Sequence, residues 1–172
     1  IDNNTLYFTI CTNLASGYNN CDLFYTFRQT DGKWSEIITF EKNINGSRSW
    51  ESQPSVSADG STIIFASDRK GGFSGSDLYI IQKDEKGNWS GPKNLGKNIN
   101  TQDNEKSPFL HTDNQTLFFA SNQFPSVGGY DIFYSRKDSL GSWQKPKNIG
   151  FPINTVSDEL GLFVSTDGKK AY

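Results

Sequence analysis

Three glutamates recur at equal spacing along the chain: Glu51, Glu105 and Glu159 lie 54 positions apart. Equal spacing places such residues at equivalent points of an internal repeat. A ring of carboxylates formed in this way could bind a cation or the basic groups of a peptide. The same carboxylates could instead cap turns or pair with Arg69 and Lys70, and we favour this structural interpretation.

Two further sets of residues recur with nearly the same spacing, in steps of 55 and 54. The sets are the aspartates Asp22, Asp77 and Asp131 and the tryptophans Trp34, Trp89 and Trp143. Each aspartate directly follows a loop rich in glycine or asparagine, where a carboxylate can accept backbone N–H groups and fix the loop. We therefore interpret the aspartates as structural, with ligand contact as the alternative. The tryptophans are expected to pack against a sheet from its outer strand.

The sequence holds few residues in the pattern of a catalytic centre. No nucleophile elbow lies near His111, the single histidine, and we interpret it as a tolerated strand residue. Residues 57–60 and 165–168 partly match the Asp-box of sialidases, but the spacer between Asp and Gly and the following Trp are missing. The Asp- and Asn-rich segments lack the ligand order of an EF-hand loop, which leaves calcium as an open alternative. We predict no catalytic residue, no metal site and no cofactor.

The two cysteines, Cys11 and Cys21, have a spacing that matches no zinc or iron–sulfur pattern. They flank the loop that joins two expected strands of the first repeat unit, and an antiparallel hairpin would bring them close together. We expect a disulfide in an oxidising compartment, with two free thiols as the alternative.

The composition favours β-structure and argues against some classes of partner. Of 172 residues, 34% are hydrophobic and 14% are aromatic, a profile rich in Phe, Tyr and Trp. The formal net charge is -2 with no run of like charge, which argues against nucleic-acid and anionic-membrane partners. No apolar stretch approaches the ~20 residues that span a bilayer, and residues 1–4 do not resemble a signal peptide.

The chemistry-bearing positions are set by a repeat of about 54 residues, whose step is marked by Asp59, Asp113 and Asp167. Within one unit, residues 53–57 predict a first strand, Asp59 and Gly60 a hairpin turn, and residues 62–66 a second strand. Residues 77–81 predict a third strand, and a fourth is expected to carry Trp89 and to end near residues 94–96. Four antiparallel strands in each unit predict the blade of a β-propeller.

The expected second strands are apolar without alternation, at residues 6–8, 63–65 and 117–119. Such a strand requires burial on both faces, which packing between two neighbouring blades supplies. We therefore predict that Phe65 and Phe119 are buried.

The blade units are expected at approximately residues 1–50, 51–104, 105–158 and 159–172, the last of them incomplete. The chain is expected to open inside a hairpin turn at Asp2 and Asn3 and to stop in mid-strand at Tyr172. Because a propeller ring needs roughly four to eight blades, we expect the intact protein to be longer or its blades to be completed by something else.

Two groups of motifs carry a family resemblance. Residues 52–60 followed by 64–69, and residues 107–109 followed by 117–122, resemble the Pro-Asp type of WD-repeat-like propeller found in TolB. Residues 128–134, Trp143, residues 146–150 and residues 152–154 resemble the propeller segments of OmpA-family envelope proteins of Bacteroidetes, such as the type IX secretion component PorE. The first unit departs from this pattern, since Asn19 and Asn20 stand where the glycines lie.

The resemblance implies a periplasmic, outer-membrane-associated location and a role in holding or recognising protein partners of the cell envelope. In that family the propeller is one module of a longer chain, so contact with peptidoglycan would come through a separate domain. The leading hypothesis is a non-catalytic scaffold, for which Glu51, Glu105, Glu159 and Arg69 are candidate partner-binding residues near the central channel. The alternative is part of a propeller enzyme, a glycosidase or a peptidase-associated domain, whose catalytic residues lie outside this segment.

Overall fold

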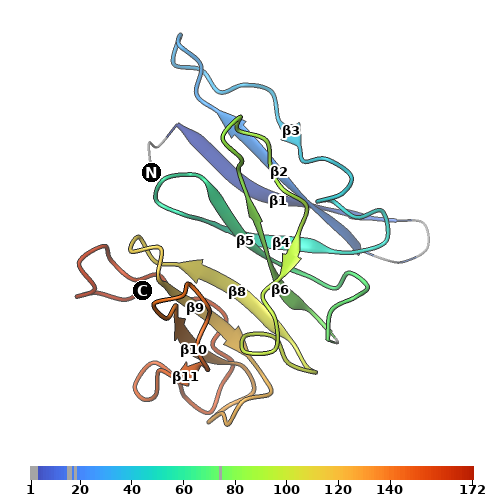
Figure 1. Ribbon diagram of the computed structural model, residues 1–172. Helices are drawn as coiled ribbons and strands as arrows, with labels where there is room; N and C mark the ends of the chain where they lie inside the picture. Colours follow the sequence, from blue (N-terminus) through green and yellow to red (C-terminus); the bar gives the residue numbers. More distant parts are fainter. Residues whose placement is uncertain (1–3, 15–16, 18, 74) are drawn as a thin grey trace.

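The computed structural model describes residues 4–14, 17, 19–73 and 75–172, and its regular elements in these ranges are all β-strands. The hairpin turn expected at Asp2 and Asn3 lies outside the described residues. No helix in the described ranges is long and apolar enough to cross a membrane. The predicted all-β class is confirmed (Figure 1).

The strands form three antiparallel sheets that follow one another in chain order (Figure 1). The first sheet holds β1 (Thr5–Asn13), β2 (Asn19–Phe27) and β3 (Ile38–Thr39). The second holds β4 (Glu51–Val56), β5 (Thr62–Ser67), β6 (Asp77–Gln82) and β7 (Lys93–Asn94). The third holds β8 (Glu105–Leu110), β9 (Thr116–Ser121), β10 (Asp131–Arg136) and β11 (Lys147–Asn148). The second and third sheets are thus the predicted four-stranded meanders.

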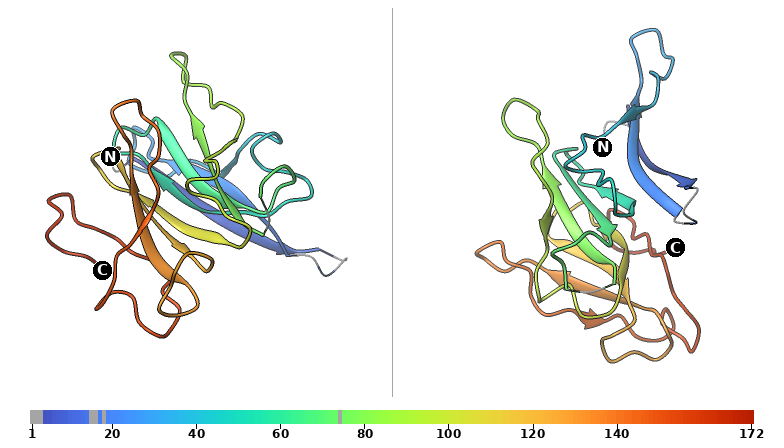
Figure 2. Two further views of the ribbon diagram at one scale, coloured as in Figure 1. Left: turned by 60° about the horizontal axis from the view of Figure 1, so that its bottom comes forward. Right: turned by 90° about the vertical axis from the view of Figure 1, so that its right-hand side faces the viewer.

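The first strands of the second and third sheets, β4 and β8, lie against each other, and β1 of the first sheet lies against β4. In the right-hand view of Figure 2 the second sheet lies between the other two. The backbone N–H of Ser107 in β8 donates to Gln53 Oε1 in β4 at 2.9 Å. The N–H of Leu110 donates to Ser55 Oγ at 2.8 Å. Side chains of one first strand therefore bond the backbone of the next, which fixes the register between the two sheets.

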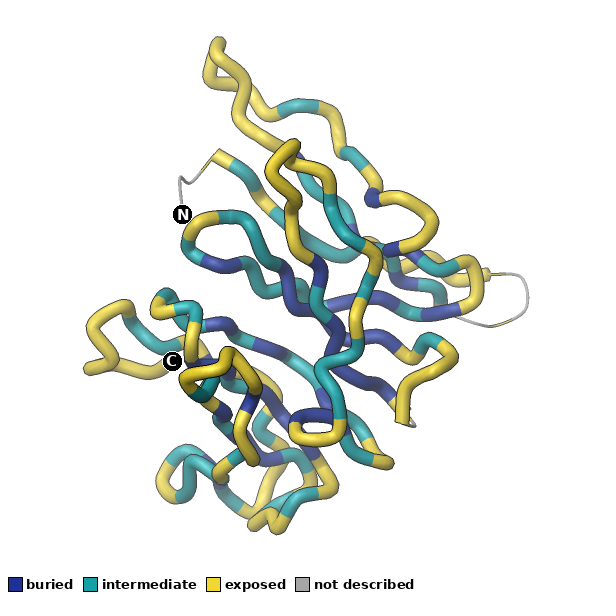
Figure 3. Tube along the Cα trace, viewed as in Figure 1, coloured by how far each residue is buried: buried dark blue, intermediate teal, exposed yellow. Residues whose placement is uncertain are grey.

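Strand β5 is buried on both faces, as its unbroken apolar run predicts (Figure 3). Phe65 packs with Leu23 of the first sheet, whereas Ile64 packs with Phe119 of the third. Phe65 and Phe119 are 0% and 1% exposed, which confirms the prediction for both residues. Leu6 in β1 differs, being 53% exposed.

The ends of several strands differ from the sequence prediction. The first strands begin at Glu51 and Glu105 themselves, two residues earlier than expected in the case of β4. The fourth strands β7 and β11 have only two residues each, and Trp89 stands outside β7 in an isolated bridge with Lys83. Pro92 and Pro146 directly precede β7 and β11, but β3 is equally short after Ile37, so the length of the fourth strand does not depend on a proline.

The predicted turns between first and second strands are confirmed. The N–H of Gly60 donates to Ser57 O, and the N–H of Asn114 donates to His111 O, each at 2.9 Å. Gly60 and Asn114 have φ angles of 70° and 55°, a left-handed conformation that glycine and asparagine tolerate best.

Protonation of Asp59 should weaken its turn at low pH. Hydrogen bonds from Ser57 Oγ, Ser61 N and Ser61 Oγ lower the pKa of Asp59 from 3.8 to about 2. Because this pKa is depressed by folding, the charged carboxylate stabilises the fold above about pH 4, and the contribution is lost as the pH falls through about 2. Asp59 is exposed, so we expect less than about 1 kcal/mol. An NMR titration of the carboxylate measures the pKa, and a midpoint near 4 would contradict the turn geometry.

Candidate functional site

The carboxylate of Glu51 points into the protein and is fully buried. It accepts hydrogen bonds from Gly46 N and Ser67 Oγ, both at 2.8 Å, and pairs with Arg69 Nη2 at 3.0 Å. It thereby ties the segment before β4 to the end of β5.

Glu105 and Glu159 repeat this arrangement without an arginine. Glu105 accepts hydrogen bonds from Thr101 N, Thr101 Oγ1 and Ser121 Oγ, at 2.8, 2.6 and 2.8 Å. Burial raises its pKa, against the lowering effect of these bonds. Glu159 accepts from Thr155 N and Thr155 Oγ1 at 3.1 and 2.6 Å. Each glutamate caps the turn just before it, and Glu51 and Glu105 are inaccessible to a ligand, so these two form no ligand-binding ring.

The guanidinium of Arg69 also bonds groups within the fold. Besides Glu51, it donates to the carbonyl oxygens of Asn43 and Ile44 at 3.3 and 2.5 Å. It also lies 5.4 and 5.0 Å from the ring centroids of Phe65 and Tyr79, in cation–π range. Arg69 therefore joins the segment before β4 to the core of the second sheet, rather than facing a partner.

The repeated aspartates fix the loop before the third strand in two of the three units. Asp77 accepts from Phe73 N at 2.7 Å and from Asn94 Nδ2 at 3.1 Å, and burial raises its pKa. Asp131 accepts from Val127 N and Gly128 N at 2.7 and 3.0 Å. Burial alone would raise the pKa of Asp131, but its hydrogen bonds outweigh burial and lower it.

Asp22 has a different environment. Its carboxylate accepts a hydrogen bond from Asn20 Nδ2 at 3.2 Å, and burial raises the pKa of the carboxyl. The substitution of asparagines for glycines in the first unit thus coincides with a different way of holding the loop.

The repeated tryptophans all face a basic residue across an isolated bridge. The pairs are Arg28 with Trp34, Lys83 with Trp89 and Lys137 with Trp143. Trp34 is 49% exposed and Trp143 only 9%, so packing against a sheet holds for Trp143 and not for Trp34.

Three asparagines that recur with the same period were not predicted from the sequence as a structural set. In each unit one side chain accepts from, and donates to, the backbone of a single third-strand residue: Asn45 with Leu23, Asn100 with Leu78 and Asn154 with Ile132. All six distances are 2.8 or 2.9 Å. A full search for the repeat period would have found this set.

His111 lies against the turn that follows β8. Its Nε2 lies 3.2 Å from the carbonyl oxygen of Ser165, and its Nδ1 accepts from Asp113 N at 3.3 Å and lies 3.4 Å from Asp113 Oδ1. Both ring nitrogens thus contact turn and strand residues of the fold.

Cys11 and Cys21 lie directly opposite each other in the β1–β2 ladder and form a disulfide, with their Cα atoms 4.0 Å apart.

Replacing both Cys11 and Cys21 with serine should lower the free energy of unfolding by about 2–3 kcal/mol, because the bond restricts the unfolded chain. Urea unfolding measures the loss. A reducing agent should destabilise the native protein equally and leave the double variant unchanged; two free thiols in the denatured, unreduced protein would contradict the bond.

A groove of about 220 Å³ crosses the first strands of the second and third sheets and the segment after Glu159. We call it the inner-strand groove; Pro54, Pro108, Phe109, Leu160 and Phe163 contribute its apolar surface. Leu160 and Phe163 are 48% and 66% exposed, and the rings of Phe109 and Phe163 lie 5.2 Å apart.

Unusual backbone geometry shapes the inner-strand groove. Gln53 and Ser107 have φ angles of 56° and 48°, and each lies where the ladder of its first strand shifts register. Residues other than glycine adopt this region at a cost, and such outliers concentrate at functional sites. Pro54 and Pro108 lie within these bulges and line the groove.

A comparison with solved structures identifies the fold. The structure of TolB from Acinetobacter baumannii is similar to this chain, with a TM-score of 0.54 and 20% sequence identity, over 88% of this chain and 31% of TolB. The chain has the fold of a β-propeller. The TolB-like repeat expected from residues 52–69 agrees with this likeness, which at such identity concerns the fold alone. No protein-family model and no curated protein matches the sequence.

Proposed function

We propose that this chain is a non-catalytic β-propeller module of a larger cell-envelope protein, and that it binds a protein partner through the inner-strand groove. The observation that carries the proposal is the apolar lining of the groove on the first strands β4 and β8, where Pro54, Pro108 and Phe109 lie beside Phe163. An exposed apolar surface of this kind suits the apolar side chains of a protein segment.

The geometry of the polar residues supports a binding role over a catalytic one. Three residues have side chains suited to acid–base catalysis: Glu51, Glu105 and His111. The polar atoms of these side chains form hydrogen bonds within the fold.

The cell envelope is supported by two separate features. A disulfide such as that of Cys11 and Cys21 persists in oxidising compartments, of which the periplasm is one. The motifs of the third unit resemble propeller segments of OmpA-family envelope proteins. Our proposal is therefore a periplasmic module associated with the outer membrane, of the PorE-like type found in type IX secretion, with any peptidoglycan contact made by a separate domain.

Site-specific photo-crosslinking tests the groove. A photoreactive phenylalanine analogue replaces Phe163 in the protein expressed in its native cells, and the same analogue replaces Leu140 as the control. Leu140 is 88% exposed and lies in the turn before Trp143, outside the groove. We expect a discrete crosslinked protein from position 163 that is absent from position 140 and is lost in a Phe109→Asp background. Equal crosslinking from both positions would contradict the proposal.

A further inference from the structure

A notch lies beside the tryptophan at each of the two joints between the described sheets. At the joint between the second and third sheets, Leu95, Gly96 and Trp143 are among the residues that line it. At the joint between the first and second sheets, Phe40, Glu41 and Trp89 occupy the equivalent positions. The repeat thus builds the same notch twice, with different chemistry.

The notch between the first and second sheets has aromatic walls. We call it the aromatic notch; Tyr25, Phe40, Glu41 and Trp89 are among the residues that line it, and Phe40 is only 5% exposed at its base. The ring centroids of Tyr25 and Phe40 lie 5.2 Å apart, and those of Phe40 and Trp89 lie 5.9 Å apart. In the next unit Tyr25 is replaced by Ile80, so the grouping of rings and carboxylate belongs to the first joint.

Within the part of the chain that the structure describes, the Glu41 carboxylate forms no hydrogen bond and no ion pair. No basic side chain is among the residues that line the aromatic notch. An anionic group beside aromatic faces attracts a cation, since the face of each ring carries negative charge density.

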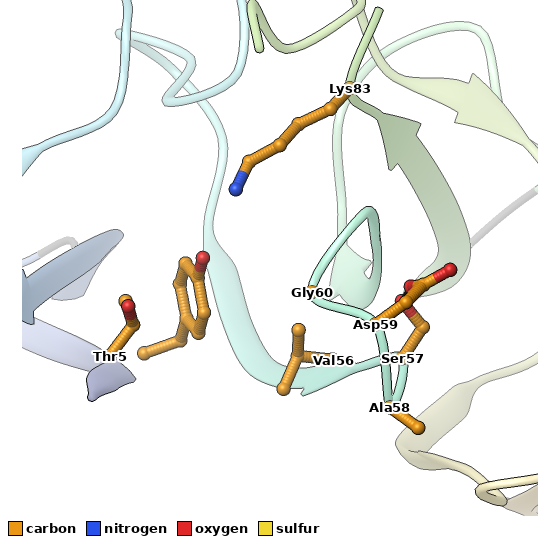
Figure 4. Close-up of a pocket in the computed structure, with 8 residues that line it drawn as sticks. Thr5, Val56, Ser57, Ala58, Asp59, Gly60 and Lys83 are labelled. Atoms are coloured by element: carbon orange, nitrogen blue, oxygen red, sulfur yellow. Dashed lines mark hydrogen bonds between the residues drawn. The ribbon is translucent and has the colours of Figure 1, made fainter. Parts of the chain in front are cut away.

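Trp89 already holds one ammonium group in this protein. Lys83 Nζ lies 4.8 Å from the centroid of its ring. Lys83 itself reaches into a separate hollow, lined by Thr5, Val56 and the turn at Asp59 and Gly60 (Figure 4). The Trp89 ring is therefore placed to interact with an ammonium group, while Lys83 itself does not line the aromatic notch.

The size of the aromatic notch limits the ligand. Its volume is about 180 Å³, below the ~300–1,000 Å³ of sites that enclose whole drug-sized molecules. It suits one head group, such as an alkylammonium or the end of a lysine side chain.

We propose that the aromatic notch binds an organic ammonium group, held by Tyr25 and Trp89 above the buried ring of Phe40 and paired with the Glu41 carboxylate. The ammonium can belong to a free amine or to a lysine of a protein. The site lies apart from the inner-strand groove and does not depend on its role.

NMR titration of the 172-residue chain tests the site. The probes are tetramethylammonium, its neutral isostere 3,3-dimethylbutan-1-ol, and N-acetyl-lysine methylamide. We expect shifts of Tyr25, Phe40 and Trp89 resonances with the two cations and not with the neutral isostere. Tighter binding of the lysine derivative would point to a protein lysine as the source, and tighter binding of tetramethylammonium to a free quaternary amine.

Two variants separate binding from folding. Glu41→Gln changes an exposed side chain and should weaken cation binding about 5-fold or more. The double variant Tyr25→Ile, Phe40→Leu installs the residues that the next unit uses, and it should abolish binding while keeping a folded spectrum. Glu85→Gln, in an exposed turn, is the matched control and should bind as the native chain does.

Three results would overturn the proposal. One is equal binding of the neutral isostere, and another is unchanged cation binding in Glu41→Gln and in the folded double variant. The third is a preference for a neutral sugar such as N-acetylglucosamine over both cations, which would assign the rings to carbohydrate stacking. Because the inner-strand groove is untouched by these variants, failure here leaves the crosslinking result from position 163 independent.

Discussion

Replacing Glu51 with alanine should lower the free energy of unfolding by about 3–5 kcal/mol, because it removes one partner of a buried ion pair. The side chain of Arg69 is only 16% exposed and would lose the carboxylate that lies 3.0 Å away. Gly46 N and Ser67 Oγ would each lose an acceptor at 2.8 Å. Urea unfolding of the variant and the native chain measures the difference.

A second variant distinguishes the effect of the unpaired Arg69 charge from that of a general packing defect. In the double variant Glu51→Leu, Arg69→Met the uncompensated arginine is gone, so we expect stability to recover part of the way toward the native value. The control Glu85→Ala, in an exposed turn, should change stability by less than about 0.5 kcal/mol. A loss below about 1 kcal/mol for Glu51→Ala would mean that Glu51 does not tie β4 to β5 as the structure shows.

Replacing Phe119 with alanine should cost about 3–5 kcal/mol, since it removes a large ring from a closed core. Phe119 is 1% exposed and packs with Ile64 of the second sheet and Phe133 of its own sheet. The cavity would open between two sheets, and thermal and urea unfolding should both report the loss.

The matched control for Phe119 is Leu140→Ala, a truncation of a large apolar side chain that is 88% exposed. It should leave stability within about 0.5 kcal/mol of the native value. If the two variants lost similar stability, the second and third sheets would not share the core described above.

The repeat could be predicted because the same residue types recur along the sequence with one period. Apolar second strands flanked by Asp59-Gly60 and Asp113-Asn114 specify the strand, the turn and two-sided burial together. These are local signals that the tertiary structure reinforces. The length of the fourth strand was harder to predict, because Trp89 suggested a longer strand, whereas the regular ladder covers only Lys93–Asn94.

The direction of the repeated glutamates could not be predicted from spacing. Equal spacing shows that Glu51 and Glu105 are equivalent, but it does not show whether they face a channel or the interior. Their partners, such as Gly46 N and Thr101 N, come from the preceding connection, whose path depends on the packed sheets. The inner-strand groove was missed for a similar reason, since the positive φ angles of Gln53 and Ser107 have no signal in residue type.

Amide hydrogen exchange at Leu23, Leu78 and Ile132 tests most directly whether the repeated polar residues build the blades. Each of these amides donates to an asparagine side chain of its own unit, at 2.9, 2.8 and 2.8 Å. We predict that all three exchange slowly, with protection close to that of global unfolding, while the exposed turn amides of Lys86 and Leu140 exchange rapidly. Rapid exchange at Leu78 and Ile132, comparable with the turn amides, would contradict the blade structure on which the proposed function rests.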